Sequence, residues 1–320
     1  MIDLIAQLIN ITLVFSSALI FAAMGGIFSE RAGIIALSLE GYMIGGAFLA
    51  AVAAHVYEQL GWGASSAYLA FFTAMIAGML LALIHALATV TYGADQVVSG
   101  VVINFLAAGL SVFLVKVIYQ GAGQTPTLKT AVFSKWSIPY LSDLPLIGPG
   151  FFRMYPTTYL ALFTVALTAW ILWRTPFGLR LRSLGEHPAA AASLGISVRR
   201  YRYIGVITSG ALAALGGATI TLTTTGNFSH ATIAGQGFIA LAAMIFGQWN
   251  PHWVLLAALF FGMATGLKNI IQLYPWARDI PTEWIYMLPY VLTLIVLSSA
   301  ISRARPPKAL GEAYDLSRRT

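Results

Sequence analysis

Residues 66–90 read SAYLAFFTAMIAGMLLALIHALATV, an apolar run that contains no Asp, Glu, Lys or Arg. A helix needs about 20 consecutive, mostly apolar residues to cross the hydrocarbon core of a bilayer, and this run is long enough. Its apolar residues do not alternate with polar ones at a period of two, as the strands of a membrane barrel do. The run therefore predicts a membrane-spanning helix, and it decides the class of fold.

Similar runs recur along the chain, and the composition agrees with them. The chain has 320 residues, of which 58% are hydrophobic and 9% charged, and its mean hydropathy is +0.80. Soluble proteins carry about 25% charged residues, so 9% cannot cover a water-facing surface of this size. We expect an all-α polytopic membrane protein with about nine (eight to ten) spanning helices. The nine apolar segments are 8–28, 34–55, 66–90, 96–118, 156–173, 203–224, 233–248, 253–272 and 284–301.

Several kinds of chemistry are excluded by what the sequence lacks. Without cysteines, the chain has no disulfide, thiolate metal site or cysteine nucleophile. The stretch GMATGLK at 262–268 lacks the GK[ST] ending of a phosphate-binding loop, and no HExxH motif, paired histidine ligands or nucleophile elbow occurs. We therefore expect no enzyme activity, no metal and no cofactor. The net charge of +7 is interpreted as a signal of membrane orientation, not of nucleic-acid binding.

Basic residues indicate which ends of the spans face the cytoplasm. The connector 174–202 carries many arginines against one acid, Glu186, and the tail 302–320 is also basic. Because Lys and Arg concentrate on the cytoplasmic side, we expect both segments there, with a cytoplasmic C-terminus, in the plasma (cell inner) membrane. Four predicted spans lie between the two segments, which returns the chain to the same side. Counting back places the N-terminus and the loop 119–155 outside.

The two halves of the chain share a short pattern. SSAL at 16–19 precedes Gly25–Gly26 and then EGYM at 40–43, whereas SGAL at 209–212 precedes Gly216–Gly217 and then QGFI at 236–239. The predicted topology makes the copies opposite in direction, and inverted repeats with glycine-interrupted helices are typical of transporters. We expect a single domain, 1–320, with a first repeat over 8–173, the connector, a second repeat over 203–301 and the tail.

The connector carries helix signals of its own. Pro176 predicts the end of the preceding span, because proline cannot continue a helix interior. Pro188 suits a first helical turn, the alanines at 189–192 favour helix, and Gly195 suits a C-terminal cap. The spacing predicts a helix of about two turns over 188–194, roughly 10 Å long. On these signals alone, the segment is either a coupling element or an ordinary interfacial loop.

Five stretches, in order along the chain, together resemble a known family. They resemble the permease subunits of ABC importers, in the branch for simple sugars, nucleosides and branched-chain amino acids, and most closely the nucleoside type. The match covers nearly the whole chain. The stretches are SERAG with EGYM (29–43), DQVVSG with Asn104 (95–104), RSLGEHPAA with GI (182–196), GQGFIALA with FGQWNP (235–251) and PKALGEAY (307–314).

The resemblance implies a membrane subunit that works with partners. These are an ABC ATPase subunit, a second permease subunit in a heterodimer and an extracytoplasmic substrate-binding protein, with lipid around the spans and no nucleic acid. The resemblance also implies that the connector docks on the ATPase. The connector residues matched for this role are Arg182, Gly185, Glu186, Pro188, Ala189, Ala190 and Gly195.

The implied solute is a nucleoside, and a simple sugar or a branched-chain amino acid is the alternative within the class. One departure bears on this choice: the nucleoside branch usually has Asn and Gly where this chain has Ala36 and Ser38, which removes an amide able to bind substrate. An ion-coupled secondary transporter is the alternative class. It needs several ionisable groups at mid-depth, and only Glu40 and His85 are candidates.

Six residues are candidates for the translocation path: Glu40, Asn104, Gln236, Phe238, Thr224 and Asn227. Glu40 begins an apolar segment, where it is either functional or a helix-start carboxylate stabilised by amides or by Arg31; we favour the second interpretation. Asn104 either lines the path or bonds between helices. The polar run 221–229 is either a gate or a solvated helix end. Gln236 holds the position of Glu40 in the second repeat.

Overall fold

The structure is a computed structural model that describes residues 2–137, 139–140, 142, 147–271, 284, 287, 291, 294 and 305–314. Six helical stretches in this part of the chain are long and apolar enough to cross a membrane, so the fold is all-α and multi-pass, as the composition predicts. They are α1 (Ile2–Arg31), α2 (Leu39–Gln59), α3 (Ser65–Ala86) with the π-helical turn η1 (Leu87–Thr91), α4 (Gln96–Ile118), α6 (Pro156–Arg174) and α9 (Val198–Ile220) with the π-helical turn η2 (Thr221–Thr225).

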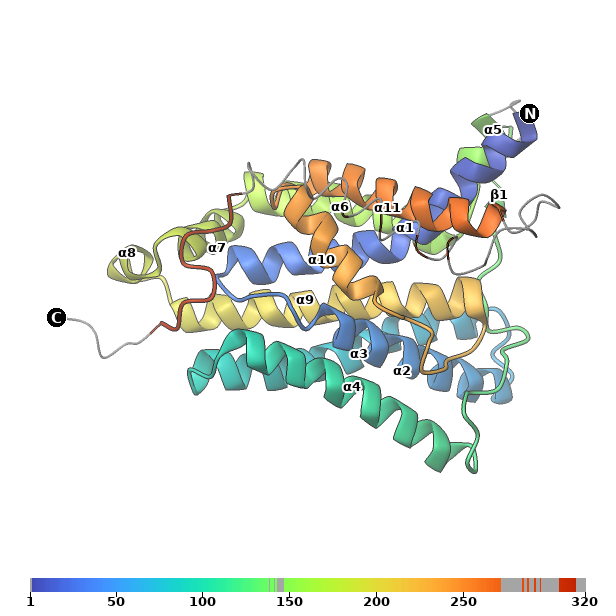
Figure 1. Ribbon diagram of the computed structural model, residues 1–320, viewed down its shortest axis with the longest axis horizontal. Coiled ribbons are helices and arrows are strands. Elements are labelled where there is room, and N and C mark those ends of the chain that lie inside the picture. Colours follow the sequence, from blue (N-terminus) through green and yellow to red (C-terminus); the bar gives the residue numbers. More distant parts are fainter. Residues whose placement is uncertain are drawn as a thin grey trace.

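Shorter elements complete the described part of the chain. They are α5 (Ile147–Phe151), α7 (Pro176–Glu186), α8 (Pro188–Ser193), α10 (Gln236–Phe246) and an antiparallel pair of strands, β1 (Trp136–Ser137) and β2 (Arg153–Met154), together with the longer helix α11 (Pro251–Ile271). Figure 1 shows α7 and α8 at one end of the bundle, here called the connector end. The N-terminus, α5 and β1 lie at the opposite end, here called the far end.

Helix α9 is the centre of the bundle and packs along α1, α2 and α3. Glycines on α9 and on α1 allow the two helices to approach closely. A Cβ added to Gly216 would lie 2.6 Å from the carbonyl oxygen of Ala18 on α1, and one added to Gly25 on α1 would lie 2.7 Å from that of Ser209 on α9. Membrane helices associate through such small residues, because lipid tails are as apolar as the side chains and no hydrophobic force drives the helices together.

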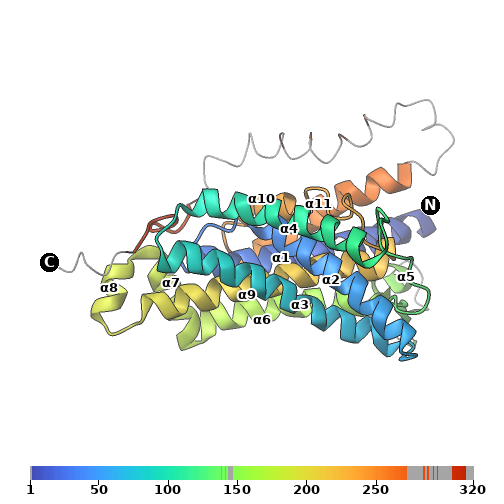
Figure 2. The ribbon, with the colours of Figure 1, turned by 90° about the horizontal axis from the view of Figure 1, so that it is seen from below.

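Helix α4 presents an apolar outer face. It lies at the edge of the bundle in Figure 1 and, after a 90° turn, in Figure 2. Phe105 is 74% exposed and Phe113 is 61% exposed, whereas Ile103 and Ala107 are buried against the bundle. A large exposed apolar face is expected where lipid or another apolar subunit covers it.

The predicted segments agree with the helices at several places and differ at others. Segment 96–118 coincides with α4, and the short segment 233–248 corresponds to α10. Helix α2 starts at Leu39 and not at 34, because residues 34–36 form no regular secondary structure and residues 37–38 form a turn. Helix α9 starts at Val198 and not at 203, so three arginines assigned to the connector belong to a spanning helix. Segment 284–301 lies almost entirely outside the described residues, and the expected count of nine spans stays a prediction.

Replacing Gly216 with isoleucine should destabilise the bundle, because the new side chain would overlap Ala18. Overpacking of this kind costs about 1–3 kcal/mol. We expect a lower midpoint of thermal unfolding, measured by size-exclusion chromatography of detergent-solubilised protein after heating. The matched control is Gly109→Ile on the exposed face of α4, where an added Cβ meets no atom within 4 Å. Equal midpoints for the two variants would contradict this packing.

Candidate functional site

Helices α2 and α10 begin inside the bundle and not at its ends (Figure 1). The irregular segment 32–38 runs inward from the connector end before α2 starts, and segment 226–235 runs inward from the far end before α10 starts. The two N-termini meet, since a Cβ added to Gly237 would lie within 2.5 Å of the backbone nitrogen of Glu40. Irregular backbone at membrane depth is tolerated where protein surrounds it or where it lines a water-filled path.

Glu40 joins the two helix starts. Its Oε1 accepts a hydrogen bond from the backbone N–H of Gly235 at 2.7 Å, and its Oε2 accepts one from Gly237 at 2.6 Å. The residue is 7% exposed. The carboxylate satisfies amides that the first turn of α10 leaves free, and it faces the positive end of that helix. Glu40 is therefore a helix-start carboxylate, but the helix whose amides it binds is α10, not its own helix α2.

Buried side chains bond the backbone of segment 32–38. Gln96 Oε1 accepts from the N–H of Ile35 at 2.8 Å, and Glu30 Oε1 accepts from that of Ala36 at 3.1 Å. Asn104 Nδ2 donates to the carbonyl oxygen of Leu37 at 2.9 Å. A buried backbone group left unpaired costs about as much as a lost hydrogen bond, so these side chains make the irregular segment possible.

Glu30 extends the network to the turn between α10 and α11. Its Oε2 accepts from Trp249 Nε1 at 2.6 Å, and Trp249 is 3% exposed. The backbone of Gln248 and Trp249 is left-handed, with φ of 52° and 55°. A tryptophan in this conformation is uncommon, and here the indole bond to Glu30 holds it in place.

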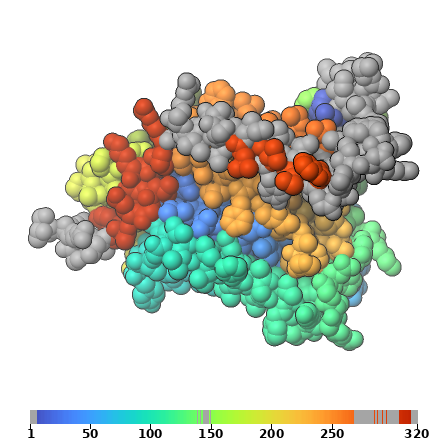
Figure 3. All heavy atoms as spheres, in the orientation of Figure 1, coloured from blue at the N-terminus to red at the C-terminus, as the bar shows by residue number. Residues whose placement is uncertain are grey.

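The six path candidates fall into two groups. Glu40 and Asn104 are buried in contacts with the chain itself, Asn104 accepting from the N–H of Gly41 at 2.7 Å as well as binding Leu37. The other four have accessible surface: Phe238 is 48% exposed, Thr224 is exposed, and Gln236 and Asn227 are partly exposed. Figure 3 shows segment 226–246 on the molecular surface alongside α4.

The far end is covered by the segment that follows α4. Thr125 N donates to the carbonyl oxygen of Phe228 at 2.9 Å, which ties this cover to the segment before α10. Lys135 Nζ donates to Asn10 Oδ1 on α1 at 2.7 Å, and burial lowers the pKa of Lys135. The long loop predicted between spans is therefore attached to both α1 and the entry to α10.

The connector is largely helical. Helix α8 spans Pro188–Ser193, which confirms the helix predicted over 188–194, and Gly195 has the expected positive φ, 80°. Helix α7 was not predicted: Pro176 ends α6 but also opens α7, where the Thr175 hydroxyl accepts from the N–H of Gly178 at 3.2 Å. Pro176 therefore marks two boundaries, the end of α6, which was predicted, and the start of α7, which was not.

The seven connector residues matched by resemblance face different surroundings. Ala189, Ala190 and Gly195 are exposed, and Glu186 and Pro188 are partly exposed. Gly185 is buried, because a Cβ there would lie 2.6 Å from the carbonyl oxygen of Arg31. The guanidinium of Arg182 lies over the Trp173 ring, 4.2 Å from its centroid. Only α8 and the adjoining turn therefore offer free surface to a partner among these positions.

The tail links the connector to the irregular segment. Ala309 N donates to the carbonyl oxygen of Gly185 at 2.8 Å, and Gly311 N donates to that of Gly33 at 3.2 Å. The described tail residues thus bridge α7 and segment 32–38. The sequence analysis did not name Glu30, Gln96 or Arg202 as candidate site residues. The signal that could have identified them is a charged or amide side chain next to an apolar run.

In the described part of the chain no group of three His, Cys, Asp or Glu side chains is placed to hold a metal ion. The site consists of helix starts, buried amides and two buried carboxylates inside a multi-pass bundle, with a helical connector at one end. Interrupted helices of this kind are typical of membrane transporters.

The comparisons with known proteins agree with this class. The family described as branched-chain amino acid transport system / permease component matches residues 8–297, and the chain belongs to it. The guanosine ABC transporter permease protein NupQ of Bacillus subtilis is 46% identical over 314 residues, 98% of each chain. The nucleoside ABC transporter permease protein NupC of Lactococcus lactis is 44% identical over 303 residues, 94% of each chain. A putative glucose ABC transporter permease protein of Haloferax volcanii is 31% identical over 335 residues, 97% of this chain and 98% of its own.

Replacing Glu40 with glutamine should loosen the start of α10. One amide oxygen can accept from Gly235 or Gly237, but the NH₂ group then faces the other N–H, which is left unpaired. An unsatisfied buried group costs about 1–3 kcal/mol. We expect a lower thermal midpoint and a large loss of transport in reconstituted vesicles.

The control for Glu40→Gln is Glu58→Gln, since the Glu58 carboxylate accepts from Lys129 N and Thr130 N at the partly exposed far end of α2. Water can replace those bonds, so its effect should be smaller. A thermal midpoint and transport rate for Glu40→Gln equal to those of the wild type would contradict the capping role.

Proposed function

We propose that this permease imports a nucleoside as the membrane subunit of an ABC importer. The observation that carries the proposal is the 46% and 44% identity, over nearly the full length, to permeases named for guanosine and nucleosides. The identity to a relative named for glucose is lower, at 31%, which makes a simple sugar the second candidate.

The departure from the nucleoside pattern at Ala36 does not oppose this assignment. Ala36 is 1% exposed and its N–H is bonded to Glu30, so its side chain packs inside the protein and does not face a solute path in this conformation. Ser38 is equally buried, at 1% exposure, at the start of α2. Both positions shape the irregular segment.

In this proposal the connector end is cytoplasmic, and α8 docks on the ATPase subunit through Ala189 and Ala190, with Glu186, Pro188 and Gly195 beside them. Arg182 and Gly185 support α8 without contacting the ATPase: Arg182 packs on Trp173, and Gly185 bonds to the tail. A shift of the connector would reach Gly33 through the Gly185–Ala309 and Gly311–Gly33 bonds, and from there the start of α2, Glu40 and α10. Such a transition repacks two discrete arrangements of a few elements.

The organisation of the chain is part of the proposal. We infer one domain over 1–320 with about nine spans, a cytoplasmic C-terminus and two inverted repeats, 8–173 and 203–301. The opposite entry directions of segments 32–38 and 226–235 support the inversion. The path candidates Gln236, Phe238, Thr224 and Asn227 would face the solute.

The partners follow from the same proposal. A second, different permease subunit would complete the path, an ABC ATPase pair would power it, and an extracytoplasmic binding protein would deliver the nucleoside at the far end. The exposed apolar faces of α3 and α4 are available for lipid and for the second permease.

The substrate is tested by reconstituting the importer with its own binding protein, ATPase and second permease in vesicles. We expect ATP-dependent accumulation of radiolabelled guanosine, with at least about tenfold less accumulation of glucose or leucine. Accumulation of glucose or leucine without guanosine would contradict the substrate. Accumulation driven by an ion gradient without ATP would contradict the class.

The docking role of α8 is tested with Ala190→Trp, which adds a large side chain to an exposed position. We expect at least about a tenfold loss of substrate-stimulated ATPase activity and loss of the ATPase from the purified complex, while the thermal midpoint of the permease is unchanged. Ala64→Trp at the exposed start of α3, at the far end, is the matched control. An ATPase that remains bound and fully stimulated in Ala190→Trp would rule out docking at α8.

A further inference from the structure

A cavity of about 540 Å³ lies at the connector end, beside the start of α9. Its walls come from five parts of the chain: η1, α8 through Ala192, the turn between α8 and α9, the first turns of α9, and the tail. The residues that matter for its chemistry are Thr91, Ser197, Arg199, Arg202 and Tyr314. The cavity is distinct from the helix starts at Glu40, and it does not include Ala189 or Ala190 of α8.

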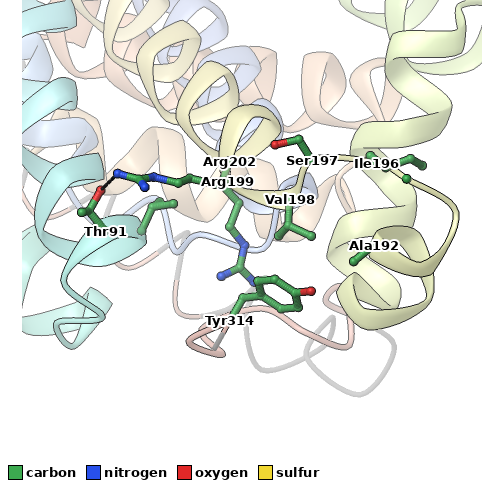
Figure 4. A pocket seen from close by; sticks show the side chains of 10 residues that line it. Thr91, Ala192, Ile196, Ser197, Val198, Arg199, Arg202 and Tyr314 are labelled. Atoms are coloured by element: carbon green, nitrogen blue, oxygen red, sulfur yellow. Dashed lines mark hydrogen bonds between the residues drawn. The ribbon is translucent and has the colours of Figure 1, made fainter. Parts of the chain in front are cut away.

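Arg202 is the largest fully buried side chain among the described residues, at 1% exposure. Its Nε and Nη2 have no hydrogen-bond partner there. Figure 4 shows its side chain extending from α9 along the cavity to the ring of Tyr314. A buried charge without compensation is costly, so the unpaired guanidinium points to an anion that belongs beside it.

A second guanidinium and a helix start face the same space. Arg199 Nη2 donates to Thr91 Oγ1 at 3.0 Å, as Figure 4 shows, and its guanidinium carbon lies 5.9 Å from the centroid of the Tyr203 ring, so no carboxylate neutralises its charge in these contacts. Ser197 begins α9 without a side-chain capping bond, so the first N–H groups of this 23-residue helix are open to a ligand. Anions, phosphate above all, bind where free amides and the helix dipole coincide with arginine.

Two acidic groups of the tail act on Arg202 within the described part of the chain, the Glu312 carboxylate and the Tyr314 phenol. Glu312 is exposed, and neither Nε nor Nη2 of Arg202 bonds to it. Two arginines and a helix start therefore outweigh one exposed carboxylate. The cavity is also larger than a phosphate ion needs, and its volume lies in the range that holds small organic ligands.

We propose that this cavity is a binding site for the phosphate group of a phosphate monoester or of an anionic lipid headgroup, held by Arg202, Arg199 and the start of α9. The ligand would join the tail, α8, α9 and the end of α3 in one unit. The proposal does not depend on which solute the permease carries.

The test measures the thermal midpoint of the full-length permease in detergent against guanosine monophosphate, inorganic phosphate and equal concentrations of chloride. We expect a saturable stabilisation by one of the phosphates and not by chloride. A parallel arm compares nanodiscs of phosphatidylglycerol with nanodiscs of phosphatidylcholine. Stabilisation in the soluble arm identifies a free phosphate ligand, and stabilisation only by phosphatidylglycerol identifies a lipid headgroup. No stabilisation in either arm overturns the proposal.

Variants assign the effect to the cavity. Arg202→Gln and Arg199→Gln should each raise the phosphate concentration that gives half of the maximal stabilisation about tenfold or more. Arg200 is exposed and lies outside the cavity, so Arg200→Gln should leave this concentration unchanged. Without phosphate, Arg202→Gln should be at least as stable as the wild type, because it removes an unpaired buried charge. If Arg202→Gln does not fold, Arg199→Gln still tests the cavity, because Arg199 is exposed and its replacement leaves the buried core unchanged. Equal shifts in the wild type and Arg199→Gln would overturn the assignment.

Discussion

An irregular backbone segment inside an apolar bundle is the constraint on which the rest of this structure depends. The first residues of segment 32–38 bond back to the end of α1, but the N–H groups of Ile35 and Ala36 and the C=O of Leu37 need partners from buried side chains. Glu30, Gln96 and Asn104 supply them, and the tail adds Gly311. The same requirement at the start of α10 is met by Glu40. Four polar side chains between positions 30 and 104 and the backbone of residues 235, 237 and 311 are thereby collected into one network.

This network brings the five stretches that resemble ABC permeases into contact with one another. Stretch 29–43 forms hydrogen bonds with three of the others. Gln96 and Asn104 of stretch 95–104 bond to it, and so do Gly235, Gly237 and Trp249 of stretch 235–251. The tail stretch, 307–314, bonds to it through Gly311. The connector joins through Gly185, which bonds to Ala309. In the proposed mechanism, a displacement of the connector would act on a set of contacts that ends at the start of α10.

Much of the fold followed from periodicity and length, and most of the site did not. Apolar length identified α3, α4 and α6, and proline and glycine placed α8. Helix α7 was missed because Pro176 ends one helix and opens another at the same point. Bonding between helices was one of the two roles predicted for Asn104, and its bond to Gly41 of α2 agrees with it. The roles of Glu30 and Gln96 could not be derived, because each bonds the backbone of an irregular segment, and hydropathy does not report such partners. Arg202 was assigned to a polar connector, since charge alone does not show that a guanidinium is buried.

The central claim is that the junction held by Glu40 borders the solute path, and Phe238, 48% exposed in the first turn of α10, reports on it most directly. The chain contains no cysteine, so Phe238→Cys introduces the only thiol. In the assembled importer, we predict that a membrane-impermeant thiol reagent modifies this cysteine and that nucleoside delivered by the binding protein slows the modification. Modification only by a lipid-soluble reagent, unaffected by nucleoside, would place Phe238 against lipid and contradict the account.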